Sequence, residues 1–319
     1  MPSEFDLIRR HFTRPARHTE LAVGDDAALL APRPGMRVAV STDMLVAGTH
    51  FFADTDPEGL GWKTLAVNVS DLAAMGAAPR WAFLALALPR ADEAWIAAFA
   101  RGFFACADAF GVDLAGGDTT RGPLALSVTI AGEVPAGAAI TRGGAHAGDD
   151  LWVSGQPGCA ALGLAALRGE AELDAPHRAQ FVDALQRPQP RVALGFALRG
   201  LASAMLDVSD GLLGDLRHIL ECSGTGAIVE AAALPLAALA ASGADAALCR
   251  RCLLAGGDDY ELLFAAPPRH RGAIEALSAR LGLPLHRIGE FTRERERLML
   301  READGTLAAP AAYGYDHFA

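Results

Sequence analysis

Acidic residues in this sequence recur at the ends of apolar segments or beside glycine, serine and threonine. Carboxylates gathered at one end of a sheet repel one another unless cations lie between them. Oxygen ligands without a set of histidines and cysteines favour Mg²⁺, Mn²⁺ or Ca²⁺ over zinc. Each segment alone is more typical of a turn, but together they predict a cation site that also holds phosphate. The segments are Gly24-Asp25-Asp26, Ser41-Thr42-Asp43, Asp71, Gly116-Gly117-Asp118-Thr119-Thr120, Asp207-Val208-Ser209-Asp210-Gly211 and Gly257-Asp258-Asp259.

Asp71 lies in residues 65–79, where apolar and small residues recur at helical spacing. Thr64, Asn68 and Asp71 form an oxygen-bearing stripe beside the apolar one. We expect Gly76 and Pro79 to end this helix. Because an unpaired buried charge is costly, Asp71 needs a cation or several donors beside it, unless it lies on a solvated edge.

Two segments are suited to holding phosphate. Gly116-Gly117 lets backbone N–H groups approach an anion, with Asp118 beside it. Ser209 falls where a strand gives way to a helix, whose N-terminus can bind phosphate. Arg142 is either a charge clamp or a surface arginine, and His50 contacts either a substrate phosphate or the core.

Composition excludes several classes of protein. The chain has 319 residues, 51% of them hydrophobic, which suits two globular domains. A net charge of −10 argues against nucleic acid as a partner. Lys63 is the only lysine, so neither a P-loop lysine nor a protein-kinase lysine–glutamate pair is possible. Phosphate must therefore be held by Mg²⁺, backbone N–H groups and arginine.

The sequence also predicts the compartment. No apolar run reaches the roughly 18 residues that span a membrane. The first residues are charged and lack the apolar core of a signal peptide. The five scattered cysteines are typical of reduced thiols. We expect a cytoplasmic protein with no membrane partner, and no zinc at the Cys249–Cys252 pair.

Strands alternate with helices in both halves, which predicts an α/β (mixed α+β) protein of two layered domains. Besides the helix around Asp71, expected helices lie near residues 3–13, 92–110, 158–169, 176–186, 191–203, 211–220, 246–254 and 269–281. Expected strands lie near 37–42, 80–88, 114–117, 124–133, 150–155, 204–209, 226–231, 285–291 and 297–301. A glycine-rich stretch after Pro135 marks the boundary between domains 1–137 and 138–319.

The motifs together resemble the thiamine-monophosphate kinase family, within the superfamily of aminoimidazole ribonucleotide synthetase. The resemblance runs over the whole chain, and the STD…GTHF and GYDHF motifs separate this branch from its relatives. The motifs that carry the resemblance are GDDAALL, STDMLVAGTHF, AVNVSDLAAMGAAP, GGDTTRGP, LDVSDGL, GGDDYELLF and the terminal GYDHF.

The resemblance implies ATP-dependent phosphorylation of thiamine monophosphate to thiamine diphosphate, the last step of that biosynthesis. It implies a homodimer whose N-terminal sheets combine, with ATP bound between the domains. The implied metal ligands are Asp26, Ser41, Thr42, Asp43, Asp71, Asp118, Asp207 and Asp210. Gly117, Asp118, Arg142 and Ser209 would contact ATP, and His50, Asp258 and Tyr315 the thiamine substrate. Family members often have Glu at position 258, and Asp25 is an alternative to Asp26.

The expected mechanism is direct in-line attack by a substrate phosphate oxygen, aided by several Mg²⁺ ions, with Asp43, Asp71, Asp118 and Asp210 nearest the reaction. The attacking phosphate is already ionised at neutral pH, so no general base is required. Alternatives are another ATP-using member of the superfamily, such as a ribonucleotide synthetase, and a non-catalytic dimer that binds nucleotide or cations.

Overall fold

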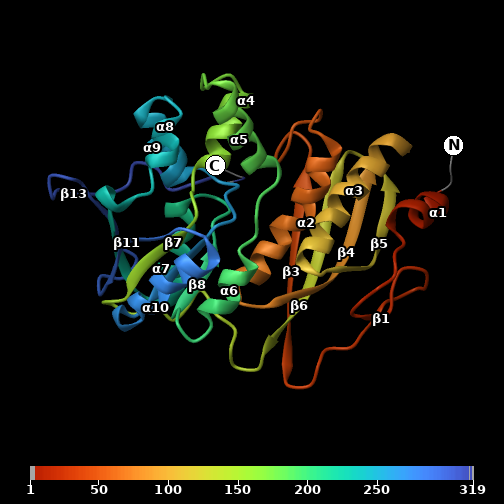
Figure 1. Ribbon diagram of the computed structural model, residues 1–319, viewed down its shortest axis with the longest axis horizontal. Coiled ribbons are helices and arrows are strands. Elements are labelled where there is room, and N and C mark those ends of the chain that lie inside the picture. The colour runs from red at the N-terminus through yellow and green to blue at the C-terminus, as the bar shows by residue number, and fades with distance from the viewer. Residues whose placement is uncertain (1–3, 316, 318–319) are drawn as a thin grey trace. The chain divides into compact units, whose positions relative to one another are not determined.

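The computed structural model describes residues 4–315 and 317, and the chain forms two compact units. The first comprises Met1–Leu72 and Ala77–Gly137, and the second Ala73–Gly76 and Ala138–Ala319. Both units combine helices with a sheet, so the expected mixed α/β class and two-domain organisation are confirmed (Figure 1).

The first unit is built on a four-stranded sheet in the order β3-β6-β4-β5. Its strands are β3 (Met36–Val46), β4 (Ala78–Leu88), β5 (Asp113–Arg121) and β6 (Ala125–Pro135). β6 pairs antiparallel with β3 and β4, whereas β4 and β5 are parallel. A short hairpin, β1 (Thr19–Leu21) and β2 (Leu29–Leu30), follows α1 (Glu4–Leu7) and the π-helical turn η1 (Ile8–Phe12).

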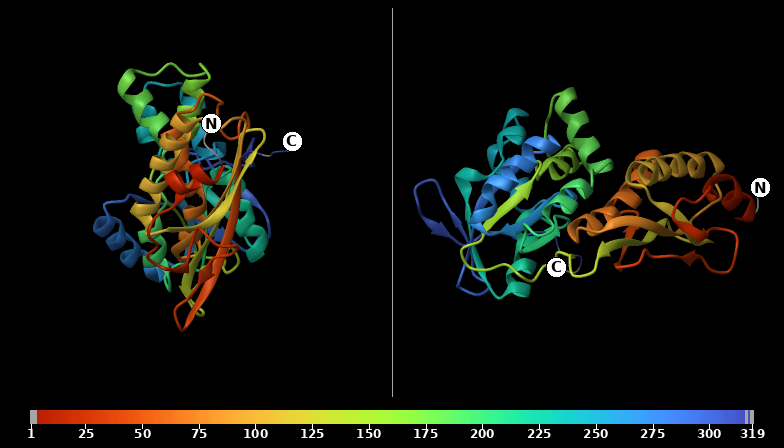
Figure 2. Two further views of the ribbon diagram at one scale, coloured as in Figure 1. Left: turned by 90° about the vertical axis from the view of Figure 1, so that its right-hand side faces the viewer. Right: turned by 60° about the horizontal axis from the view of Figure 1, so that its bottom comes forward.

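Two long helices, α2 (Pro57–Ala74) and α3 (Glu93–Phe110), lie along the same face of this sheet (Figure 2). Glycine lets them approach closely, because a Cβ atom at Gly61 would lie 2.0 Å from the Phe99 carbonyl oxygen. The apolar stripe predicted for α2 is fully buried. The helix ends at Ala74, with Gly76 in the left-handed conformation (φ 63°). Pro79 does not end the helix as expected, since it lies inside β4.

The second unit has a seven-stranded sheet in the order β13-β12-β9-β11-β7-β10-β8. The strands are β7 (Asp150–Ser154), β8 (Ala204–Asp207), β9 (Gly226–Glu230), β10 (Leu262–Ala266), β11 (Leu285–Thr292), β12 (Leu298–Arg301) and β13 (Leu307–Ala308). All described pairings are antiparallel except β9 with β12.

Helices cover both faces of this sheet, and alternate strand residues supply the two cores. Leu263 and Ala265 of β10 join one core with α4 (Cys159–Leu167), α5 (Ala175–Gln186), α7 (Leu212–Ser223) and α9 (Ala246–Ala255). Leu262 and Phe264 join the other with α6 (Val192–Leu198) and α10 (Arg271–Leu281). Short turns η2 (Ala231–Ala233), α8 (Ala237–Ala241) and η3 (Pro268–His270) complete the unit.

Two strands are longer than their sequences indicated. β3 continues past Thr42 to Val46, so Asp43 lies within the strand and not at its end. β5 continues past Gly116-Gly117 to Arg121, which places Asp118 inside a strand as well. Polar residues extend these strands because pairing with β6 and β4 supplies the backbone hydrogen bonds.

Candidate active site

Ser41 and Asp71 are in direct contact in the first unit. The Ser41 hydroxyl donates to Oδ2 of Asp71 at 2.5 Å, joining β3 to α2. Two residues further along β3, the Asp43 amide donates to Oδ1 of Asn68 at 3.1 Å. Asn68 is 1% exposed and its side-chain amide donates to the Thr64 carbonyl oxygen. The oxygen-bearing stripe of α2 therefore faces Ser41 and Asp43, and Asp71 is half-buried with a strand hydroxyl as donor.

Thr42 does not join this group through its side chain. Neighbouring residues of a strand point to opposite faces, and the Thr42 hydroxyl lies 2.9 Å from that of Thr129 on β6. Its exposed side chain is on the face of the sheet away from α2.

The acidic pair before β2 lies in an exposed loop. Oδ1 of Asp25 accepts a hydrogen bond from the Asp26 amide at 2.9 Å, so Asp25 is engaged in holding the turn. Both residues are exposed, so the choice between Asp26 and Asp25 as a ligand stays a prediction.

His50 follows β3 in a turn, where its Nδ1 atom accepts a hydrogen bond from the Val46 amide at 3.0 Å. A neutral ring with Nδ1 as acceptor carries its proton on Nε2. The turn thus fixes the orientation of the ring.

Gly117 is required by the packing of β5 on β4. It has φ of 154°, and a Cβ atom there would lie 1.9 Å from the Leu84 carbonyl oxygen. The next residue, Asp118, is exposed beside a small cavity of about 50 Å³ whose lining includes Gly116, Gly117 and Thr119. Gly117 therefore has a structural reason that is independent of phosphate.

In the second unit, the backbone amides after β8 are already bonded to a carboxylate. Oδ2 of Asp215, on α7, accepts from the amides of Ser209, Asp210 and Gly211 at 3.0, 3.0 and 3.1 Å. Burial raises the pKa of Asp215 to about 7, although the amide hydrogen bonds oppose the shift. The sequence suggested these amides as a phosphate cradle, but Asp215 occupies them. The Ser209 hydroxyl lies 3.5 Å from Oδ2 of Asp210, to which it donates.

The GDDYE segment before β10 is bonded to the loop after β8. The amides of Asp258 and Tyr260 donate to the carbonyl oxygens of Ser209 and Val208, both at 2.8 Å. Close packing requires glycine here, since a Cβ atom at Gly257 would lie 2.4 Å from the Ser209 carbonyl oxygen. A proposed metal- and nucleotide-binding loop and a proposed substrate-binding loop are thus one hydrogen-bonded structure.

A cavity of about 390 Å³ lies beside α7 and the C-terminal segment. Asp210, Arg217, His218, Glu221, Tyr313 and Tyr315 are among its lining residues. The guanidinium of Arg217 lies 4.7 Å from the centre of the Tyr313 ring, and the Tyr315 amide donates to the Asp210 carbonyl oxygen at 2.9 Å. The structure therefore brings Asp210 and Tyr315 to one hollow. Asp316 and Phe318 of the terminal motif lie outside the described residues.

The remaining predicted residues have separate positions in the second unit. Asp207 ends β8 and is 7% exposed. Arg142 is exposed and lies in a loop. Its carbonyl oxygen accepts a hydrogen bond from the Ser223 hydroxyl at 3.1 Å. Among the described residues, no three His, Cys, Asp or Glu side chains are grouped closely enough to hold a metal ion. In the same part of the chain, no helix is long and apolar enough to cross a membrane.

Two family models match the chain, one in each half. Residues 24–134 match the family described as AIR synthase related protein, N-terminal domain, and residues 146–301 its C-terminal domain. A thiamine-monophosphate kinase of Salmonella typhimurium is 45% identical over 320 residues, covering 99% of this chain and 98% of that protein. This chain belongs to the thiamine-monophosphate kinase family.

Solved structures of the thiamine-monophosphate kinase family have the same fold. The crystal structure of the enzyme from Stenotrophomonas maltophilia is 48% identical, covers 91% of this chain and 92% of its own, and has a TM-score of 0.83. A second structure, described as AaThiL complexed with AMPPCP and TMP, is 29% identical with a TM-score of 0.77. It covers 93% of this chain and 92% of its own.

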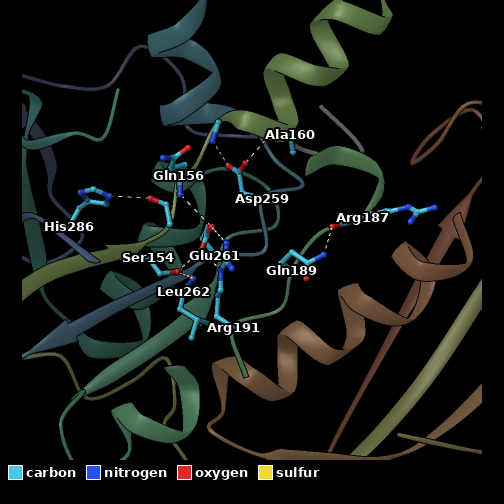
Figure 3. Close-up of polar contacts among 12 residues, drawn as sticks. Ser154, Gln156, Ala160, Arg187, Gln189, Arg191, Asp259, Glu261, Leu262 and His286 are labelled. Carbon is cyan, nitrogen blue, oxygen red and sulfur yellow. Dashed lines mark hydrogen bonds and ion pairs between the residues drawn. The ribbon is translucent and has the colours of Figure 1, made fainter. Parts of the chain in front are cut away.

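The structural roles of Asp259, Glu261 and Arg191 were not predicted from the sequence. Asp259 accepts hydrogen bonds from the amides of Gly158 and Ala160 at 2.7 and 3.4 Å, at the N-terminus of α4 (Figure 3). Burial raises the pKa of Asp259 well above its usual value. Glu261 receives two hydrogen bonds from Arg191, at 2.7 and 2.5 Å. The signal in the sequence was the acidic GDDYE segment. Its carboxylates were interpreted as candidate ligand contacts, and not as hydrogen-bond acceptors that hold the segment in place.

Proposed function

We propose that this chain transfers the γ-phosphoryl group of Mg-ATP to thiamine monophosphate, giving thiamine diphosphate and ADP. The observation that carries the proposal is full-length identity of 45% to a thiamine-monophosphate kinase, with every motif of the resemblance in order. The relative described as complexed with AMPPCP and TMP supports ATP and thiamine monophosphate as the two substrates.

Mg²⁺ is the proposed metal because the donors are hard oxygen atoms. In the first unit the ligands would be Asp26, Ser41, Asp43, Asp71 and Asp118, with Thr42 contributing through its main chain. In the second unit they would be Asp207 and Asp210. Since no three described acidic side chains enclose a site alone, phosphate and water would complete the coordination. The bound ions would neutralise the two phosphate groups that must approach each other.

Protein groups would position the two substrates. Gly117, Asp118, Arg142 and the Ser209 hydroxyl would contact ATP. His50, whose ring is oriented by the hydrogen bond from the Val46 amide, would contact a substrate phosphate. Asp258 and Tyr315 would contact the thiamine moiety, with the Tyr315 ring beside the cavity at Asp210.

The proposed chemistry needs little from side chains beyond placement. A phosphate oxygen of thiamine monophosphate, ionised at neutral pH, would attack the γ-phosphorus in line with the departing ADP oxygen. Asp43, Asp71, Asp118 and Asp210 would fix the phosphates through the metal ions. Residues 1–137 would then be the metal, nucleotide and dimerisation domain, and residues 138–319 would complete the ATP and substrate sites.

A cytoplasmic homodimer is the proposed state of the protein. Val38, Val40 and Met44 of β3 are 45%, 62% and 58% exposed, on an edge strand of eleven residues. Their alternate spacing places them on the sheet face away from Ser41 and Asp71. Long apolar edge strands are normally covered, and pairing of two such sheets would cover this one.

One product assay tests the function. The protein is mixed with Mg-ATP and thiamine monophosphate, and thiamine diphosphate and ADP are separated by chromatography, with omission of the acceptor as control. Equal amounts of both products are expected. ADP without thiamine diphosphate would indicate a different acceptor, as in the ribonucleotide-synthetase branch. Absence of ADP would favour a protein that binds nucleotide without turnover.

A further inference from the structure

The GDDYE segment has two residues in an unfavourable backbone conformation. Asp258 and Tyr260 have φ values of 68° and 53°, although neither is glycine. Residues with side chains rarely adopt this left-handed region, and where they do the surroundings must hold them there.

Asp259 and Glu261 of the GDDYE segment are held by hydrogen bonds to other parts of the second unit. Asp259 accepts from the Gly158 amide at 2.7 Å, and Glu261 is bound by Arg191 and by the Ser154 hydroxyl at 2.5 Å (Figure 3). The main chain at Asp258 and Tyr260 is bonded to Ser209 and Val208. These anchors place the segment so that Asp258 and Tyr260 keep their unusual conformation.

Within this anchored segment, Tyr260 contacts Asp258 directly. Tyr260 is only 8% exposed, and its hydroxyl donates to Oδ1 of Asp258 at 3.2 Å. A buried ring cannot change position freely, so the hydroxyl is a fixed donor. This donor holds one carboxylate oxygen of Asp258, which is half-buried.

We propose that Tyr260 is a positioning residue for thiamine monophosphate, fixing the Asp258 carboxylate that contacts it. This rests on the proposed function, in which Asp258 binds the substrate. The hydrogen bond from Tyr260 to Oδ1 restrains the orientation of this carboxylate.

Tyr260→Phe tests this, because it removes the hydroxyl and keeps the ring. We expect the KM for thiamine monophosphate to rise about 3- to 10-fold, which corresponds to the net contribution of one typical intramolecular hydrogen bond. The kcat and the KM for ATP should stay within about twofold, since the group acts on one substrate only. Thermal unfolding of the variant should match that of the unmodified protein within a few degrees.

A double-mutant cycle separates positioning from a general packing effect. In an Asp258→Ala background, Tyr260→Phe should have no further effect on the KM for thiamine monophosphate. An unchanged KM in the single variant, or an equal rise in both backgrounds, would overturn the inference. Failure of the proposed function is distinct, since the unmodified protein would then form no thiamine diphosphate, and the inference would fall with it.

Discussion

The hydroxyl of Ser41 lies 2.5 Å from Oδ2 of Asp71, although the two residues are 30 positions apart in the chain. This hydrogen bond links the edge strand β3 to the helix α2. It restrains the carboxylate on a largely buried helix. Such a restraint would suit the proposed role of Asp71 as a metal ligand.

Asp71→Asn tests the role of this carboxylate. It retains the size of the side chain but removes the charge that would bind Mg²⁺, so we expect kcat to fall by at least about 100-fold. The measurement is thiamine diphosphate formation at saturating Mg²⁺. Asp108→Asn is a matched control, because Asp108 forms exposed ion pairs with Arg14 and Arg17. Turnover of Asp71→Asn within twofold of the unmodified protein would contradict the assignment.

Asp215 should matter for stability through its three amide hydrogen bonds. Asp215→Leu leaves the amides of Ser209, Asp210 and Gly211 without their acceptor. Each unsatisfied group costs about 1–3 kcal/mol, so we expect a loss of at least about 3 kcal/mol in the free energy of unfolding. Asp215→Asn keeps an acceptor oxygen and should lose about 1 kcal/mol.

Urea denaturation followed by circular dichroism measures both Asp215 variants. Glu294→Gln, at an exposed position, controls for loss of a surface charge. Equal destabilisation by leucine and asparagine would show that packing, and not the acceptor, is what Asp215 supplies.

The Arg191–Glu261 pair gives a prediction about buried charge. Glu261 is 4% exposed and receives both hydrogen bonds of one guanidinium. Arg191→Met leaves the carboxylate without its cation, which costs about 3–5 kcal/mol in the free energy of unfolding. Arg191→Lys keeps the charge but not the paired geometry, and should cost less. Denaturation of both variants measures the two losses of stability, with Arg280→Met at an exposed position as control. Equal losses for Arg191→Lys and Arg191→Met would refute the prediction.

The pKa of Asp113 predicts a pH dependence of stability. Burial raises the pKa of this carboxyl, but hydrogen bonds from the amides of Arg17 and His18 and the Thr19 hydroxyl outweigh burial, and the net pKa lies below its usual value. The folded state thus binds the proton less tightly than the unfolded one. The stabilisation is present above the unfolded pKa, near 3.8, and is lost as the pH falls through the folded value.

Asp113→Asn should therefore be less stable than the unmodified protein at pH 7, and the difference should shrink toward pH 3. Denaturation of both proteins across this range measures it. A difference that stays constant with pH would mean that the hydrogen bonds do not depend on the charge.

Periodicity in the sequence predicted α2 and its buried stripe, because a helix displays its spacing directly. It placed the end of β3 too early, since Asp43 and Met44 continue a strand that is stabilised by pairing with β6. Once β3 is extended, its alternation alone separates Thr42 from Ser41 and Asp43. The role of a polar residue near a strand end thus depends on pairing that sequence does not display.

Long-range partners were not accessible to sequence reasoning. Arg191 and Glu261 are 70 positions apart, and nothing near either residue indicates the other. Asp215 is different, since it is an acidic residue in the first turn of a predicted helix, a typical place for a cap. Sequence showed the position but not that the carboxylate would bond backward to the amides of Ser209 and Gly211.

The exposed apolar residues of β3 give a prediction about assembly. Val40 is 62% exposed within one chain, so Val40→Glu should leave the fold of that chain intact. If two sheets pair over this face, a buried unpaired carboxylate would weaken the dimer strongly. Sedimentation velocity should show a dimer for the unmodified protein and a shift to monomer for Val40→Glu. Leu307→Glu is the matched control, because Leu307 is 44% exposed in the other unit. A Val40→Glu protein that stays dimeric would place the subunit contact elsewhere.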